Sequence, residues 1–209
     1  MLDGFNPLHT HIDKGFRIHP SLVITEEGTP LGVLSTTNHT RDKEEKNPSK
    51  KHRNSLSIEE KESFRWLLGY REACKLAEKL PHVEVISISD REGDIYEVCL
   101  EAKIEDKQCK KADILVRSNH NRCLKDATDK TEDKLEKKLI RCPVKSEGKI
   151  ILNRYRSDEH TADVVIRSCE VLIQAPQTCQ KKSLPPIKMN AVLVSEVDPP
   201  KGIEPQNSG

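Results

Sequence analysis

The stretch VEVISISDREGDIYE, residues 83–97, indicates how this chain folds. Residues 83–89 are rich in β-branched side chains and predict a buried strand. Asp90 follows directly at the carboxyl end of that strand, and Asp94 is placed to cap a helix from residue 95 to about 105. In open α/β sheets, ligands gather beyond the carboxyl ends of strands. Asp90 is therefore the first candidate for a functional side chain.

The segments on either side of this stretch extend an α/β pattern. Residues 18–25 and 31–35 predict a β-hairpin that turns at EEGTP, and the polar residues 36–54 predict a solvated loop. Residues 57–80 predict a long helix with Ser57 as N-cap and Glu60 as its capping-box partner. Residues 112–117, ADILVR, predict another short strand. The alternation of helices and strands predicts an α/β sheet.

The character of the chain changes after about residue 122. A charge-dense stretch, residues 125–138, predicts a helix around 133–139. Three β-like runs follow at 149–155, 162–174 and 187–197, separated by Pro and Ser clusters, and predict a small, mostly antiparallel β unit. We therefore expect two regions, residues 1–122 and residues 123–209.

Composition limits the classes of function. Apolar residues make up 34% of the chain, charged residues 33% and aromatic residues 3%, which predicts a lean core. The net charge of +1 predicts no general attraction to polyanions, so any basic patch must be local. No apolar run is long enough for a membrane span and no signal pattern is present, so we expect no membrane partner and a cytoplasmic location. The seven cysteines, odd in number and without CxxC spacing, predict reduced thiols.

A carboxylate in the place of Asp90 is suited to divalent cations. Mg²⁺ prefers one or two protein carboxylates together with water and phosphate oxygens. Two such ions can activate a water and stabilise the leaving oxygen when a phosphodiester is displaced. Spacing alone also allows a simpler interpretation, in which Asp90 and Asp94 only cap the following turn and helix.

The run VISISDREGDIYE, residues 85–97, resembles the second catalytic block of DDE transposases of the insertion-sequence-4 type, to which the Tn-5 group belongs. Four further segments resemble blocks of the same family in the family order. They are HPSLVITEEGTPLGVL (19–34), EEKESFRWL (59–67), ILVRSNHNR (114–122) and NAVLVSEVDPPKGIEP (190–205). One such block is weak support, whereas five in order are strong support.

The resemblance implies an incomplete ribonuclease-H-like mixed sheet with helices, followed by a mostly antiparallel β insertion. It implies Mg²⁺ or Mn²⁺, transposon-end DNA as partner, hydrolysis and strand transfer of phosphodiesters, and association with the nucleoid of a bacterial cell. Asp90 matches the second catalytic, metal-binding acid, and Arg117 matches a basic position near the DNA end. Asn119, His120 and Arg122 lie close by as weaker DNA-binding candidates, for which an ordinary exposed turn is the alternative.

The other two acids of the family have no match in this chain. Asp3 and Asp13 precede the hairpin block without the expected strand, and Glu204 lacks the Tyr, Arg, Glu, Lys surroundings of the third acid. We therefore expect a transposase fragment, truncated at both ends, that binds metal weakly or not at all and neither cleaves nor joins DNA alone. The alternatives are a non-catalytic DNA-binding or regulatory fragment, a non-functional remnant and an unrelated metal nuclease.

The resemblance also bears on folding. In the family fold, the strand that carries the first acid lies between the hairpin and the strand at 83–89. Without that strand, unpaired edges would remain, and each buried backbone group left unpaired costs about 1–3 kcal/mol. We therefore expect a marginal monomer that associates with itself or with a full-length transposase.

Overall fold

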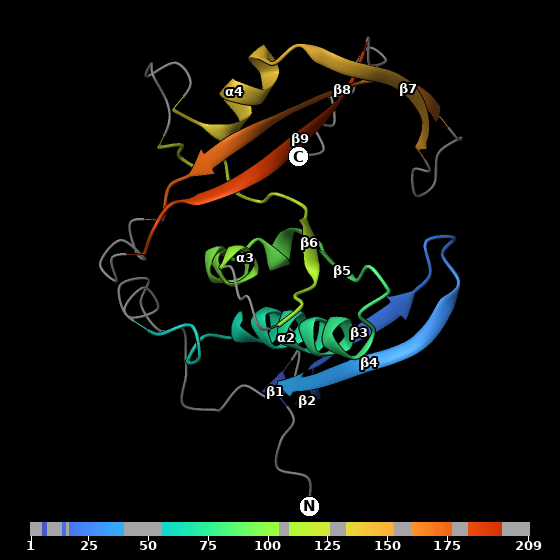
Figure 1. The fold of residues 1–209 in the computed structure, drawn as a ribbon, viewed down its shortest axis with the longest axis vertical. Helices are drawn as coiled ribbons and strands as arrows, with labels where there is room; N and C mark the ends of the chain where they lie inside the picture. Colours follow the sequence, from blue (N-terminus) through green and yellow to red (C-terminus); the bar gives the residue numbers. More distant parts are fainter. Residues whose placement is uncertain are drawn as a thin grey trace, which may run out of the picture. The chain divides into compact units, whose positions relative to one another are not determined.

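The computed structural model describes residues 6–7, 14–15, 17–39, 56–104, 109–125, 133–152, 160–176 and 184–197 (Figure 1). It has a mixed α/β fold, which confirms the predicted class at that level. Two compact units divide the described chain: the first unit lies within 1–88 and 97–115, and the second within 89–96 and 116–209. The predictions for Asp3, Asp13, Glu204 and residues 40–54 fall outside the described residues.

The predicted hairpin is confirmed in the first unit, but its second strand continues through residues 36–39, which the sequence assigns to a loop. Strand β3 (Arg17–Ile24) pairs antiparallel with β4 (Pro30–His39), with two irregularities in register. The turn is closed by backbone hydrogen bonds from Gly28 N to Thr25 O (3.0 Å) and from Thr25 N to Thr29 O (2.9 Å). Gly28 has a φ of 85°, a value that suits glycine because it carries no Cβ. A short pair, β1 (Asn6–Pro7) with β2 (Lys14–Gly15), also belongs to this unit.

Helix α2 (Phe64–Lys79) packs against this hairpin. The ring of Trp66 meets His19 edge-on at 4.4 Å between centroids. A Cβ on Gly69 would lie 3.2 Å from Ser21 Oγ, so the helix passes close to β3 at this point. The buried residues recur at helical spacing and form the core-facing stripe: Leu67, Tyr70, Ala73 and Ala77.

The predicted start of this helix is wrong. Ser57 N donates to the carboxylate of Glu60 (2.7 Å), so half of the predicted capping box forms. However, the chain continues through tight turns, with Lys61 N bonded to Ile58 O and Phe64 N bonded to Lys61 O. The α-helix begins only at Phe64, because the capping-box pair closes a separate turn before it.

Strand β5 (Ile86–Ser89) pairs with β6 (Asp113–Val116), and a 3-10 turn η1 (Arg91–Gly93) and helix α3 (Tyr96–Lys103) connect them. Asp113 N donates to Val85 O (2.9 Å), and Arg117 N donates to Ser89 O (3.0 Å). Donors and acceptors advance together along both strands, so the pairing is parallel. The carboxyl ends of β5 and β6 therefore meet at one edge.

The second unit contains the predicted antiparallel β structure. Strand β8 (His160–Ile173) is the middle strand of an antiparallel sheet, between β7 (Val144–Leu152) and β9 (Ile187–Glu196). Helix α4 (Leu135–Arg141) packs against β8 and β9. The first strand begins at Val144, earlier than residue 149 where the sequence predicts it. Buried apolar side chains of α4, β8 and β9 contribute to the core of this unit: Leu135, Leu139, Val171, Ile173, Ile187 and Leu193.

Two further predictions have a structural outcome. Six of the seven cysteines fall among the described residues, and they are thiols rather than disulfides. Among the described residues, no helix has both the length and the apolar character that a membrane crossing requires.

Candidate functional site

Asp90 lies at the carboxyl end of β5, where the sequence predicts it. Its side chain is exposed, and its backbone is extended with φ −76° and ψ −168°. One carboxylate oxygen accepts a hydrogen bond from Glu92 N at 3.0 Å and so caps the turn η1. The capping role considered from the sequence is therefore present. An ionised carboxylate has about four lone-pair sites, so one capping bond leaves capacity for a cation.

The loop that follows β6 begins at the same edge as Asp90. Because Arg117 N donates to Ser89 O, the backbone of Arg117 lies beside the residue that precedes Asp90. The side chains of Arg117, Asn119 and His120 are exposed. The structure therefore brings two segments together that are distant in the sequence, and both carry predicted site residues.

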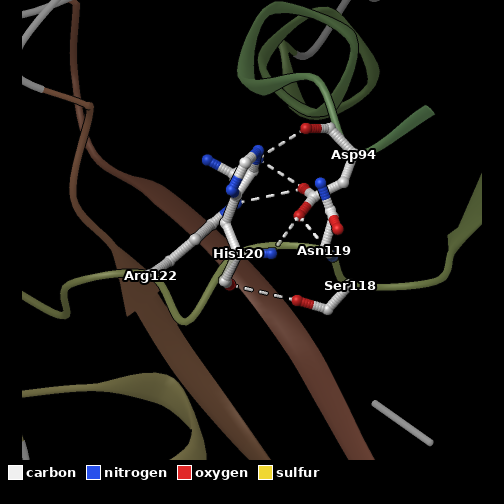
Figure 2. A network of polar contacts seen from close by, with 5 residues as sticks. All are labelled: Asp94, Ser118, Asn119, His120 and Arg122. Atoms are coloured by element: carbon white, nitrogen blue, oxygen red, sulfur yellow. Dashed lines mark hydrogen bonds and ion pairs between the residues drawn. The ribbon is translucent and has the colours of Figure 1, made fainter. Parts of the chain in front are cut away.

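Asp94 holds this loop through a network that the sequence does not predict. Figure 2 shows its carboxylate facing the turn at Asn119 and His120. Oδ2 accepts from Asn119 N (2.8 Å) and from His120 N (3.0 Å). Oδ1 accepts from Arg122 Nε (3.1 Å) and from Arg122 Nη2. Ser118 Oγ closes the turn by donating to His120 O at 3.1 Å.

Arg122 is occupied inside this network. Its side chain is 9% exposed, that of Asp94 is 5% exposed, and Nη2 also donates to Asp94 O at 3.0 Å. The guanidinium carbon lies 6.0 Å from the ring centre of Tyr96, within range of a cation–π contact. The phenol of Tyr96 in turn donates to Pro185 O. A DNA contact by Arg122 stays a prediction, but its donors described here point into the protein.

The far end of the loop is fixed by the start of the β region. Leu135 N donates to Arg122 O (2.9 Å), and Leu124 N donates to Asp133 O (2.9 Å), so that Cys123 and Lys134 form an isolated antiparallel bridge. Lys134 Nζ lies 3.0 Å from Cys123 Sγ, and this contact raises the pKa of the lysine. The loop is thus attached at both ends and in its middle.

The sequence predicts that Asp90 lies at this edge of the sheet, but it does not predict the hydrogen bonds that Asp94 makes. Asp94 was predicted to cap the next helix, whereas its carboxylate binds backbone and side-chain donors of the loop after β6, and the first of these, Asn119 N, lies 25 residues later. No spacing rule connects Asp94 with Arg122, which lies 28 residues away. Only the parallel pairing of β5 with β6 brings them together.

The described residues do not form a complete metal centre. Among them, no group of three or more His, Cys, Asp or Glu side chains is close enough to hold a metal ion. Asp90 therefore offers a single carboxylate, which suits one ligand position of Mg²⁺ rather than a full set.

Neither a scan against models of known protein families nor a search of curated proteins finds a match to this chain.

Proposed function

We propose that this chain is a fragment of a cut-and-paste DNA transposase of the DDE, insertion-sequence-4 type, with a ribonuclease-H-like core. The observation that carries the proposal is the position of Asp90. It follows β5 at the edge where the parallel strand β6 also ends and where the loop with Arg117 begins. This arrangement supports the proposal, because the resemblance assigns a metal-binding acid and a DNA-contacting loop to these two segments, and both lie at the same edge.

In the proposed function, Asp90 supplies one ligand to Mg²⁺ or Mn²⁺. When all ligands of such a centre are present, the metal activates a water and stabilises the leaving oxygen of the phosphodiester. Among the described residues, no group of three or more potential metal ligands gathers at this edge, so they do not fit a complete centre. We therefore assign no bond-breaking step to this chain alone, and we expect it to need carboxylates from elsewhere.

DNA binding is the part of the function that this chain can carry by itself. Arg117 is an exposed cation suited to a phosphate, and Asn119 and His120 add exposed hydrogen-bonding groups on the same loop. Asp94 neutralises Arg122, so we assign Arg122 to the support of the loop rather than to direct contact. A non-catalytic DNA-binding or regulatory fragment is the second candidate, favoured by this exposed loop beside a single carboxylate.

The test is DNA binding by the whole chain. Fluorescence anisotropy would be measured on duplexes tiled across the genomic DNA on both sides of the gene, with scrambled duplexes for comparison. We expect tighter binding to one end-like sequence. Arg117→Gln should weaken binding and reduce the salt slope by about one phosphate contact. The matched control is Lys149→Gln, since Lys149 is an exposed lysine paired with Asp163 on the β7–β8 strands.

A nicking assay on the same duplexes with Mg²⁺ or Mn²⁺ tests the chemistry. We expect no cleavage by the wild-type chain and none by Asp90→Asn. Equal affinity for end and scrambled duplexes, unaffected by Arg117→Gln, would contradict the proposal. Metal-dependent nicking that survives Asp90→Asn would indicate an unrelated nuclease.

A further inference from the structure

We infer that Asp94 is the positioning residue of the loop at residues 117–122, and that it sets the place of the exposed groups beside Asp90. This assignment gives Asp94 a role that capping alone does not explain. The inference has two halves. The structural half is that Asp94 fixes the conformation of the loop. The functional half is that Asp94 thereby affects DNA binding, and this half rests on the proposed function.

Each carboxylate oxygen of Asp94 binds a different part of the loop. Oδ2 accepts from two consecutive backbone amides, those of Asn119 and His120, at 2.8 and 3.0 Å. Two bonds to neighbouring amides restrict the backbone between them to a narrow range of conformations. Oδ1 accepts from the guanidinium of Arg122, which lies at the other end of the same turn. One side chain thus fixes both the middle and the end of the loop.

The pair of charges is buried, so its members depend on each other. Asp94 and Arg122 have side-chain exposures of 5% and 9%. Removing one partner from a buried ion pair leaves the other charge without compensation, which is strongly unfavourable. Asparagine at position 94 would also present an amide N–H₂ to donors that need an acceptor. The position therefore requires a carboxylate and not merely a polar side chain of similar size.

Asp94 also connects the two parts of the candidate site. It ends the turn η1 that Asp90 begins, and its own N–H donates to Arg91 O. The loop held by its carboxylate carries Arg117 at the start and His120 at the tip. A loop held in its binding conformation before the ligand arrives loses less entropy on binding. Asp94 therefore acts through the loop and not by contact with DNA.

Amide hydrogen exchange tests the structural half without any ligand. We expect Asp94→Asn to raise the exchange rates of the Asn119 and His120 amides by about tenfold to hundredfold, as expected for lost hydrogen bonds to a charged group. Amides of the β8–β9 pairing, such as that of Val171, are compared in the double variant described below, because Asp94→Asn alone leaves Arg122 as an uncompensated buried charge and destabilises the whole unit. The control is Asp163→Asn, which removes the same charge from a side chain that is 65% exposed.

A second variant distinguishes the loss of the loop contacts from general unfolding. Asp94→Leu combined with Arg122→Met removes both buried charges, so it avoids an uncompensated ion and leaves the two amides without a side-chain acceptor. Fast exchange confined to the loop in this double variant supports the assignment. Protection at Asn119 and His120 equal to that of the wild type would overturn it. Loss of protection throughout β8 and β9 in the double variant would also overturn it, in favour of a general structural role.

DNA binding then separates the two halves. If the wild-type chain binds end DNA, we expect Asp94→Asn to weaken binding at least as much as Arg117→Gln does, and Asp163→Asn to leave it unchanged. If the wild-type chain binds no DNA but the exchange result holds, the proposed function fails while the positioning of the loop stands. If DNA binding is normal in Asp94→Asn despite a loosened loop, the functional half is wrong.

Discussion

The two compact units differ in how completely they bury their apolar side chains. In the second unit, β8 has a strand on each edge, α4 packs against the sheet, and Val171 and Ile187 are 1% and 2% exposed. In the first unit, each described strand has one strand partner, and Leu22 and Ile88 are 67% and 65% exposed. Apolar side chains on these strands are therefore best buried where neighbouring strands and a helix surround them.

This difference predicts an uneven distribution of stability. The central strand of the second unit should exchange its amides most slowly, because opening it disrupts two pairings at once. The two-stranded sheets of the first unit should open more easily, since an isolated pair of strands is marginal in water. The exposed apolar edges also support the expectation that the chain associates, which stays a prediction.

The largest expected loss of stability concerns the buried ion pair of the second unit, and an exposed ion pair of the first unit serves for comparison. Arg122→Met should destabilise the second unit by about 3–5 kcal/mol, because it leaves Asp94 buried without a counter-charge. Arg71→Met is the matched control in the first unit. Arg71 binds Glu101 through two hydrogen bonds of 2.8 Å, and this contact raises the pKa of the guanidinium, but the side chain is 42% exposed.

We therefore expect Arg71→Met to cost no more than about 1 kcal/mol. Urea unfolding followed by circular dichroism measures both variants. Equal losses in the two would show that burial does not distinguish these ion pairs.

The next effect tests the core of the second unit. Leu193→Ala should lower the free energy of unfolding by about 2–5 kcal/mol, because Leu193 is buried and truncation leaves a cavity. Its neighbour Val192 lies on the same strand with half of its surface exposed, so Val192→Ala should cost less than about 1 kcal/mol. Denaturation curves of the two variants give the comparison, and a smaller loss for Leu193→Ala would contradict the packing described here.

A smaller effect is expected at Tyr70, a buried side chain of the first unit that carries a hydroxyl group. Tyr70 donates to Ala112 O at 3.0 Å, so Tyr70→Phe should cost about 1–3 kcal/mol by leaving a buried carbonyl unpaired. Burial, and then the Cys74 thiol, raise the pKa of Tyr70. The folded state therefore keeps this proton to a higher pH than the unfolded chain does.

Stability should consequently fall as the pH rises above the ordinary tyrosine pKa of about 10, and it should be unaffected by this group below that value. Thermal melts between neutral and alkaline pH would show this fall in the wild type and a weaker fall in Tyr70→Phe. The same alkaline slope in both would mean that Tyr70 is not the group responsible.

The smallest expected change in stability comes from exposed apolar side chains on two separate sheets of the first unit. Leu22→Lys and Ile88→Lys should each change the free energy of unfolding by no more than about 0.5 kcal/mol, because neither side chain is packed. Self-association should nevertheless decrease, since charged residues on strands disfavour pairing with other chains. Analytical ultracentrifugation measures this, and unchanged association would place the contact elsewhere.

Local patterns in the sequence determined much of this protein. Apolar and β-branched runs predicted the hairpin, β5, β6 and the antiparallel strands, and the position of Asp90 followed from the strand before it. The predicted burial of β5 is wrong, because Ile86 and Ile88 are exposed on a sheet of only two described strands. The start of α2 was mispredicted because Ser57 and Glu60 close a turn whose fate depends on packing beyond it. Several strands also begin or end a few residues away from their predicted positions, because pairing with a neighbouring strand extends or shortens the strand that propensity alone predicts.

Only the tertiary structure decided what Asp94 and Arg122 do. Their roles arise because β5 and β6 run parallel, which places the turn after one strand against the loop after the other. A buried ion pair between residues 28 positions apart leaves no periodic signal, because its partners belong to different local elements. Sequence specifies each strand and turn through local energetics, whereas partners across the fold are selected only when the backbone brings them within hydrogen-bonding distance.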